Sequence, residues 1–337
     1  MKTFARDDGR TLRVVDGFRE YVLAAGKRSV HPQPDWRDED YSAAAKRWMK
    51  RSQRLLADLC RWGGDIAGAR TLEVGAGEGL DCLLLGLHPF RRVVGVDLRY
   101  PLLFELSDTG ERTRRLARKI LRKLQRAGGG LNADLADRLK RGGVREVLKR
   151  LPIHFAVTDA TRMACRDDSF DFLISRVALE HIVPVDEALS EMARVVRTDG
   201  LIFHSIDPYF WLLGCHKKGL ADIPWAHARL TAHELTRFIA ERSGGAKVGV
   251  NSRYSEILNQ HTATQWRSMI EVGPFEILEW REERSPFAEA LLEEHPDVEH
   301  DLLPGIERQD LICSNIQVWL RNKPKGCVRG LERGVAP

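Results

Sequence analysis

The chain of 337 residues is 43% hydrophobic and 30% charged, with a net charge of +5, which is typical of a globular protein with one large domain or a core with insertions. It has no apolar run near the roughly 18 residues that a transmembrane helix needs, so no membrane span is predicted. The N-terminal residues include acids and no apolar core region, so no signal peptide is predicted. Its six cysteines are scattered without a Cys-x-x-Cys pair, which predicts reduced thiols and a cytoplasmic protein.

Residues 1–66 are expected to form a largely helical N-terminal cover. A short strand at 11–15 and a helix at 18–25 precede a proline-punctuated turn at 31–36. From 40 to 62, apolar residues recur at helical spacing while Arg and Lys fill the opposite face. We expect this helix to cover a sheet edge or the mouth of a ligand site. The alternative is that aromatic side chains of this segment line a substrate pocket, namely Trp36, Tyr41 or Trp48.

A glycine-rich stretch at 71–80, T-L-E-V-G-A-G-E-G-L, is the first strong motif. A short apolar strand that carries an acid, Glu73, leads into glycines at positions 75, 77 and 79. Glycines at this spacing allow a sharp turn and the close approach of a ligand to the backbone. The dinucleotide pattern G-x-G-x-x-G would need glycine at position 80, where the chain has Leu80. This difference disfavours a nucleotide-dependent oxidoreductase.

Two of the next strands end on an acid. The strand at 92–97 ends on Asp97, and the strand at 153–160 carries Asp159 near its end. An acid at the tip of the second strand is well placed to accept hydrogen bonds from a ribose diol. The later predicted elements of this region are a strand at 170–175, a helical stripe at 188–196 and a strand at 201–206.

A basic insertion at 101–150 separates the second and third strands. It holds fourteen Lys and Arg against six Asp and Glu, so the rest of the chain has a net charge of −3. Helices are predicted at 112–126, 133–139 and 144–151, with a break at the glycines 128–130. A basic amphipathic helix can contact nucleic acid or an acidic membrane. No aromatic residue is interleaved to stack on unpaired bases, so a solvated face or a cover on the core is favoured, and nucleic acid is a less favoured partner.

Residues 208–260 are expected to form an aromatic lid, because ligands bind at the carboxyl ends of strands in open α/β sheets. The aromatic residues predicted to contact the substrate are Tyr209, Trp211 and Trp225. The segment also holds the metal-ligand types Cys215, His216 and His227. Their spacing fits no Cys-x-x-Cys or His-x-x-x-His scheme, so no metal is predicted.

The C-terminal third is predicted to hold two helices and two strands. Thr231 and Glu234 are spaced as a capping box at the start of a helix at 231–242. The remaining predicted elements are a helix at 262–272, strands at 275–280 and 312–320, an acidic helical segment at 285–308 between these strands, and a loose tail at 324–337.

The order and signatures of these motifs resemble the class I S-adenosylmethionine-dependent methyltransferases over about residues 68–207, particularly the subgroup that includes ubiquinone-pathway and natural-product methyltransferases. The resemblance implies an α/β fold with a Rossmann-like, doubly wound seven-stranded sheet whose last strand is antiparallel, plus helical N-terminal and inserted segments. It implies a core at 67–323 with insertions at 101–150, 208–260 and 285–308. The implied cofactor is S-adenosyl-L-methionine, with S-adenosyl-L-homocysteine as its product.

The same resemblance implies a set of cofactor-binding residues: Glu73, Gly75, Ala76, Gly77, Gly79, Asp97, Leu98, Asp159, Ala160, Ser175 and Arg176. By this resemblance Asp97 holds the ribose hydroxyls and Asp159 the adenine amino group, with the Ala160 N–H group on a ring nitrogen. Glu73 would contact the methionine ammonium, helped by the carbonyl group of Ser175.

The acceptor is expected to be a small molecule, and O-methylation is favoured. Family members that methylate base nitrogens carry Asn/Asp-Pro-Pro-aromatic after the fourth strand, and metal-assisted catechol methyltransferases carry acids there. This chain has Ser-Arg-Val-Ala at 175–178 instead. Methylation of an aliphatic amine or of a carbon acid is the alternative that these residues also allow. Histidine suits a general base near neutral pH, and the candidates are His181, His204, His216 and His227. Of these, His204 lies in mid-strand and is expected to be a core or cofactor-side residue, and the other three are the favoured bases.

Two functions are alternatives to that of a cytoplasmic small-molecule methyltransferase. One is an RNA methyltransferase that uses the insertion at 101–150, and the other is a non-catalytic, cofactor-binding scaffold for a partner subunit. A homodimer is left open.

Overall fold

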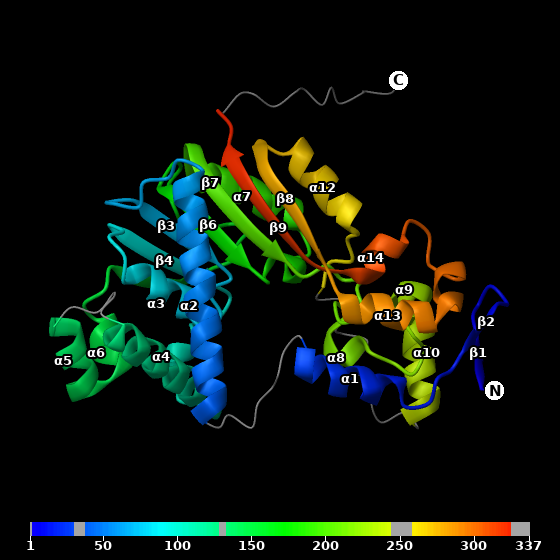
Figure 1. The fold of residues 1–337 in the computed structure, drawn as a ribbon. Helices are drawn as coiled ribbons and strands as arrows, with labels where there is room; N and C mark the ends of the chain where they lie inside the picture. The colour runs from blue at the N-terminus through cyan, green and yellow to red at the C-terminus, as the bar shows by residue number, and fades with distance from the viewer. Residues whose placement is uncertain (1, 30–37, 128–132, 244–257, 325–337) are drawn as a thin grey trace, which may run out of the picture.

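The computed structural model describes residues 2–29, 38–127, 133–243 and 258–324 (Figure 1). Several sequence predictions lie outside these described residues: the turn at 31–36 with Trp36, the glycine break at 128–130, residues 244–257 of the predicted lid, and the tail from residue 325. Within the described ranges, no helix combines the length and the apolar character needed to cross a membrane.

A seven-stranded sheet forms the centre of the fold (Figure 1). In spatial order its strands are β5 (Ile153–Val157), β4 (Arg92–Asp97), β3 (Arg70–Val74), β6 (Phe170–Arg176), β7 (Val196–Ile206), β9 (Cys313–Asn322) and β8 (Phe275–Arg284). The strands from β5 to β7 are parallel, and β9 is antiparallel to both β7 and β8. The predicted Rossmann-like sheet with an antiparallel last strand is therefore confirmed. Strand β7 starts earlier than predicted, because Val196 already pairs with Phe170 of β6.

Different helices cover the two faces of the sheet. On one face, Leu72 and Leu173 belong to a buried cluster with α7 (Val185–Val195) and α12 (Ala263–Val272). On the other face, Phe172 and Ile174 pack with Leu55 of α2 (Asp38–Arg61) and with α3 (Leu80–Gly86). This separation follows from strand geometry, because successive side chains point to opposite faces. The helix predicted at 40–62 thus covers the sheet.

The basic insertion folds as helices that pack on α2 and α3. Its elements are the 3₁₀ turn η1 (Leu102–Phe104) and helices α4 (Asp108–Arg126), α5 (Ala133–Gly142) and α6 (Val144–Leu148). The apolar stripe of α4, which includes Leu116 and Ile120, is buried against Tyr41 and Ala45 of α2. Trp48 packs at the edge of this cluster. Tyr41 and Trp48 therefore serve helix packing, and neither lines the cavity described below.

A helical lobe beside the sheet is built from three remote segments, 2–29, 207–243 and 285–312 (Figure 1). Its elements are the hairpin of β1 (Thr3–Ala5) and β2 (Thr11–Arg13), and helices α1 (Phe18–Ser29), α8 (His216–Gly219), α9 (Ala226–Arg229), α10 (Ala232–Ser243), α13 (Pro286–Glu294), η3 (Pro296–His300) and α14 (Arg308–Ile312). Phe18 and Val22 of α1 pack with Trp211 and Trp225 in the lobe interior. The expected N-terminal cover thus has two parts, because α2 lies on the sheet and α1 lies in the lobe.

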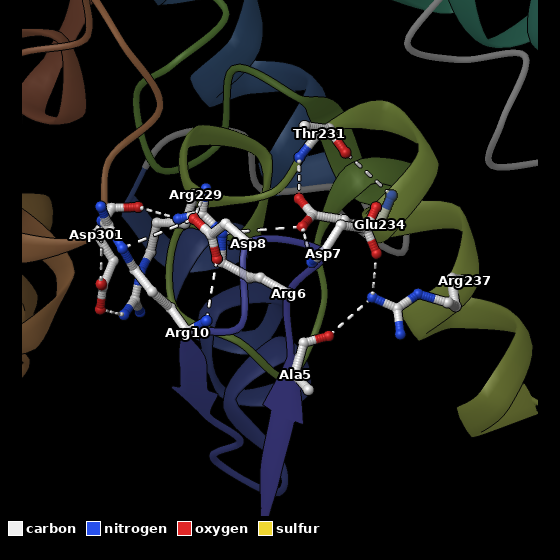
Figure 2. Close-up of polar contacts among 10 residues, drawn as sticks. All are labelled: Ala5, Arg6, Asp7, Asp8, Arg10, Arg229, Thr231, Glu234, Arg237 and Asp301. Carbon is white, nitrogen blue, oxygen red and sulfur yellow. Dashed lines mark hydrogen bonds and ion pairs between the residues drawn. The ribbon is translucent and has the colours of Figure 1, made fainter.

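Charged groups bind the N-terminal hairpin into the helical lobe (Figure 2). The carboxylate of Glu234 accepts hydrogen bonds from the N–H groups of Thr231 at 2.8 Å and Asp7 at 2.7 Å. The N–H group of Glu234 donates to Thr231 Oγ1 at 3.2 Å, which confirms the predicted capping box. Arg229 is fully buried, and its Nη2 atom lies 3.1 Å from the Asp301 carboxylate. A buried guanidinium needs such a partner because an unpaired buried charge is costly.

Candidate active site

The loop after β3 approaches the turn after β6 so closely that only glycine fits at position 75. Gly75 has a φ of 78°, and a Cβ atom there would lie 2.3 Å from the Cβ atom of Ala178. The N–H groups of Gly75 and Ala76 donate to the carbonyl oxygen of Val96 at 2.9 and 3.0 Å. These bonds hold the loop against the carboxyl end of β4.

Asp97 and Asp159 line one cavity of about 480 Å³ at the carboxyl ends of β3, β4 and β5. Asp97 Oδ2 accepts a hydrogen bond from the Gly77 N–H group at 2.9 Å, and so connects the strand tip to the glycine loop. Asp159 Oδ1 accepts from the N–H and hydroxyl groups of Thr161 at 2.9 and 2.8 Å, which lowers the pKa of Asp159. The volume is in the range of small-molecule sites, and the lowered pKa of Asp159 keeps its carboxylate charged at neutral pH.

The cavity contains most, but not all, of the predicted cofactor residues. Those that line it are Gly75, Gly77, Asp97, Leu98, Asp159 and Ala160, whereas Glu73, Ala76, Gly79, Ser175 and Arg176 do not. Lining residues that sequence analysis missed are Val74, Val96, Thr158, Thr161, Val177, Ala178, Ile182, Val183 and Pro184. Most of these flank the ends of predicted strands, and position at a strand end was the one signal that could have found them.

Glu73 is buried on the sheet face that meets α3. Cys82 Sγ donates a hydrogen bond to Glu73 Oε2 at 2.8 Å. Burial raises the pKa of Glu73 to about 8, and repulsion from the Asp81 carboxylate adds to the shift. Glu73 is therefore mostly protonated at pH 7 in the ligand-free protein.

Asp81 joins three elements through buried or half-buried ion pairs. Its Oδ2 atom lies 2.9 Å from Nη2 of Arg51 on α2 and 3.4 Å from Nε of Arg176 at the end of β6. The Arg176 guanidinium also lies over the Phe203 ring, 5.2 Å from its centroid. Arg176 therefore points away from the cavity, toward α2.

The short turn η2 (Leu179–His181) presents a histidine to the cavity. Asn259 fixes the turn, because its Nδ2 atom donates to the carbonyl oxygens of Leu179 at 2.7 Å and Ile182 at 3.0 Å. The ring of His181 stacks on that of His216, with centroids 5.3 Å apart and planes 6° from parallel. Burial of part of the ring lowers the pKa of His181, and the Asp97 charge partly offsets this shift. His181 is therefore largely neutral at pH 7 and able to accept a proton.

The other two histidine candidates lie in the interior. His227 Nε2 lies 3.1 Å from the carbonyl oxygen of Trp211, and burial lowers the pKa of His227 to about 4. His204 is fully buried in β7, and burial lowers its pKa to about 3. Of the candidate bases, the structure brings His181 and His216 together and keeps His227 apart, while His204 is a core residue as expected.

The three predicted substrate aromatics are packed inside the helical lobe. Trp211 is 2% exposed and Trp225 is 1% exposed, and Tyr209 is also buried. The indole N–H of Trp225 donates to the Leu311 carbonyl oxygen at 3.1 Å, and that of Trp211 to Asp207 Oδ1 at 3.0 Å. None of the three lines the cavity. Their contact with a substrate stays a prediction that this packing does not support.

Two features near the site were not foreseen. Val177 lines the cavity with a φ of 49°, a strained conformation for a β-branched residue. Asp207 lies directly after β7 and is half-buried, and burial raises its pKa to about 7. Burial likewise raises the pKa of Glu180 well above its ordinary value, and the nearby Asp207 charge adds to this. Among the described residues, no group of three or more His, Cys, Asp or Glu could hold a metal ion.

A methyltransferase domain family matches residues 72–204, the span that holds the glycine loop, both acids and His181. A search of curated proteins finds no match to the chain. Among solved structures, the fold is similar to an S-adenosylmethionine-dependent methyltransferase from Mesorhizobium loti, with 14% identity over 79% of this chain and 96% of that chain and a TM-score of 0.42. It is also similar to one from Methanosarcina mazei, with 16% identity over 77% and 94% of the two chains and a TM-score of 0.40. At these TM-scores the likeness has no weight for function.

The sheet order, the glycine loop and the cavity define a Rossmann-like α/β fold whose ligand site lies at the carboxyl ends of its strands. The domain match at 72–204 supports a class I S-adenosylmethionine-dependent methyltransferase as the class of this part of the chain. The residues present fit S-adenosylmethionine, because Gly75 allows the loop after β3 to turn closely against Ala178 and two strand-tip carboxylates line the same cavity.

Replacing Gly75 by alanine is expected to damage both stability and cofactor binding. The new Cβ atom would meet Ala178, so we expect a loss of about 2–4 kcal/mol in the free energy of unfolding, from positive φ and overpacking together. Affinity for S-adenosylhomocysteine should fall at least tenfold. Urea unfolding and titration calorimetry measure the two effects.

Gly68→Ala is the matched control. Gly68 has a φ of 73°, but a Cβ atom there would meet nothing within 4 Å. Gly68→Ala should lower the free energy of unfolding only by the cost of placing alanine at a positive φ, about 1–2 kcal/mol. Its affinity for S-adenosylhomocysteine should be unchanged. Equal behaviour of the two variants would contradict the steric argument.

Proposed function

We propose that this enzyme transfers the methyl group of S-adenosylmethionine to an oxygen atom of a small metabolite, natural product or glycan precursor in the cytoplasm. The observation that supports the proposal is that Asp97, Asp159 and His181 line the same cavity. When bound, the cofactor supplies an electrophilic methyl group and a good leaving group, so the protein mainly has to align the reactants and exclude water.

The strand-end residues would hold the cofactor. Asp97 would accept hydrogen bonds from the ribose hydroxyls, and Asp159 from the adenine amino group, with the N–H group of Ala160 on a ring nitrogen. The backbone of 75–79 and the side chain of Leu98 would enclose the ribose and the methionine portion. Glu73 would bind the methionine ammonium directly or through water, helped by the carbonyl group of Ser175.

His181 would act as the general base. Its lowered pKa keeps the ring neutral at pH 7, and a neutral imidazole can accept the proton that an acceptor hydroxyl loses as the C–O bond forms. The parallel ring of His216 would fix the orientation of His181. His227 is a weaker candidate because its ring is enclosed in the lobe.

The segments at 101–150, 208–260 and 285–308 are proposed as insertions on the catalytic core. Parts of the segments 208–260 and 285–308 lie in the helical lobe, next to η2. This position suits a role in selecting the acceptor. A homodimer stays an untested alternative, and nucleic acid stays the less favoured partner.

Asp97→Ala should weaken S-adenosylhomocysteine binding about 10- to 100-fold. The change removes a charged acceptor of hydrogen bonds, each of which contributes about 1.5–3 kcal/mol. It also releases the Gly77 N–H group from its partner. Calorimetry measures the affinity. Asp65→Ala is the control, since the Asp65 carboxylate also accepts a backbone hydrogen bond, from Ala67 at 2.9 Å, but lies in a surface turn. Undiminished affinity in Asp97→Ala would count against the assignment.

Cofactor binding should release close to one proton from Glu73 at pH 6.5. Its pKa is raised to about 8, so the carboxyl group is protonated before binding and must ionise to hold an ammonium group. Affinity should rise with pH, by up to tenfold per unit, and level off above pH 8. Calorimetry in two buffers of different ionisation enthalpy counts the proton. In Glu73→Gln both the proton release and the pH slope should disappear, and their persistence would exclude Glu73 as the source.

His181→Asn should lower kcat about 10²- to 10⁴-fold while leaving S-adenosylhomocysteine affinity within twofold. The assay follows transfer of a tritiated methyl group to a panel of phenols, hydroxy acids and amines. The wild-type rate should fall at acid pH, as His181 becomes protonated below its ordinary pKa of about 6.5, and the variant should lack this fall. His154→Asn, at an exposed position on β5, is the control. Transfer only to nitrogen or carbon would contradict O-methylation.

A further inference from the structure

A basic groove of about 660 Å³ lies between α2 and the strands β6, β7, β8 and β9. It shares no lining residue with the cavity that holds Asp97 and Asp159. The side chains of Phe203 and Trp319 form an apolar floor. The cationic residues of its lining are Arg47, Lys50, Arg51, Arg54, Arg176 and Arg281, against the acids Asp58 and Glu283.

Much of this positive charge is not neutralised by the protein. In the described part of the chain, Arg51 pairs with Asp81 at 2.9 Å and Arg281 with Glu279 at 2.9 Å. Arg47, Lys50 and Arg54 have no ion pair with a described carboxylate. Three unpaired cations along one helix repel one another, so an anion in the groove would be stabilised there.

Arg176 provides the buried end of the groove. Its side chain is only 9% exposed, and its Nη2 atom has no hydrogen-bond partner among the described residues. Its Nε atom, at 3.4 Å from Asp81, gives one longer ion pair. A buried guanidinium N–H group without a partner is costly, and the planar guanidinium is suited to carboxylate and phosphate oxygens.

The groove ends next to the reaction site. Arg176 lines the groove, and the next residue, Val177, lines the cofactor cavity. The N–H group of Val177 donates to the carbonyl oxygen of Ser205, which also lines the groove, at 2.7 Å. A ligand with its anionic group at Arg176 would therefore extend its other end toward the carboxyl end of β6, where the cavity lies.

We propose that this groove binds the anionic group, phosphate or carboxylate, of a small acceptor molecule. The inference rests on the proposed function and adds the chemical class of the acceptor. A small anion is favoured over a nucleic-acid backbone, because the cation at the end of the groove is nine-tenths buried and its floor is apolar.

The test uses calorimetry with inorganic pyrophosphate and, separately, citrate, on the full chain saturated with S-adenosylhomocysteine. The groove variant is Arg47→Gln/Lys50→Gln/Arg54→Gln, with exposed positions that leave the core intact. The charge-matched control is Arg112→Gln/Arg115→Gln/Arg122→Gln, on exposed positions of α4. We expect one or both anions to bind to the wild type. Affinity should fall at least tenfold in the groove variant and in Arg176→Gln, and less than twofold in the control. Tighter binding of pyrophosphate indicates a phosphorylated acceptor, and tighter binding of citrate a polycarboxylate.

Four results would overturn the inference. Two concern the anions: neither anion binds to the wild type, or anion affinity falls equally in the groove variant and in the control. The other two are a loss of S-adenosylhomocysteine affinity in the triple groove variant, and binding of a 20-nucleotide single-stranded RNA at least 100-fold tighter than that of pyrophosphate. The third result would assign the groove to the cofactor. Failure of the proposed O-methylation would show separately, in the wild-type transfer assay with tritiated methyl groups.

Discussion

The absence of a side chain at Gly75 sets the spacing on which the site depends. The loop after β3 and the turn after β6 meet where a Cβ atom would be 2.3 Å from Ala178. Hydrogen bonds to Val96 hold the same loop against β4. The ends of β3, β4 and β6 are thereby drawn together. Asp97 at the end of β4, Asp159 after the neighbouring β5 and His181 after β6 line one cavity.

A layer of ionisable groups lies next to this cavity, on the face of the sheet that α2 and α3 cover. Glu73 is hydrogen-bonded by Cys82, and Asp81 connects Arg51 of α2 with Arg176 of β6. In a buried region of low effective dielectric these charges influence one another strongly. This network contributes Arg51 and Arg176 to the lining of the basic groove, and Glu73 directly precedes Val74, which lines the cofactor cavity.

The parts of the fold that could be predicted from sequence are those with local signals. Strand and helix periods, the Thr231–Glu234 capping box and the order of the acid-tipped strands depend on residues close together in the chain. Trp211 and Trp225 show why the rest could not be predicted. An aromatic residue after a strand can face a ligand or a packed interior, and the interior here is supplied by α1 and α13, which are distant in sequence. Likewise, no local pattern distinguishes Arg176, which turns toward α2, from the cavity-facing Val177 beside it.

The helical lobe has a consequence for how the chain matures on the ribosome. Arg6 donates a hydrogen bond to the carbonyl oxygen of Asp301, 295 positions further along the chain. At a synthesis rate of about 5–20 residues per second, the N-terminal strand pair waits roughly 15–60 s for that partner. The catalytic core can begin to collapse as β3 to β7 emerge, whereas the hairpin of β1 and β2, translated before the core, is among the last elements to find its neighbours. Vectorial synthesis thus places the completion of the lobe at the end of folding.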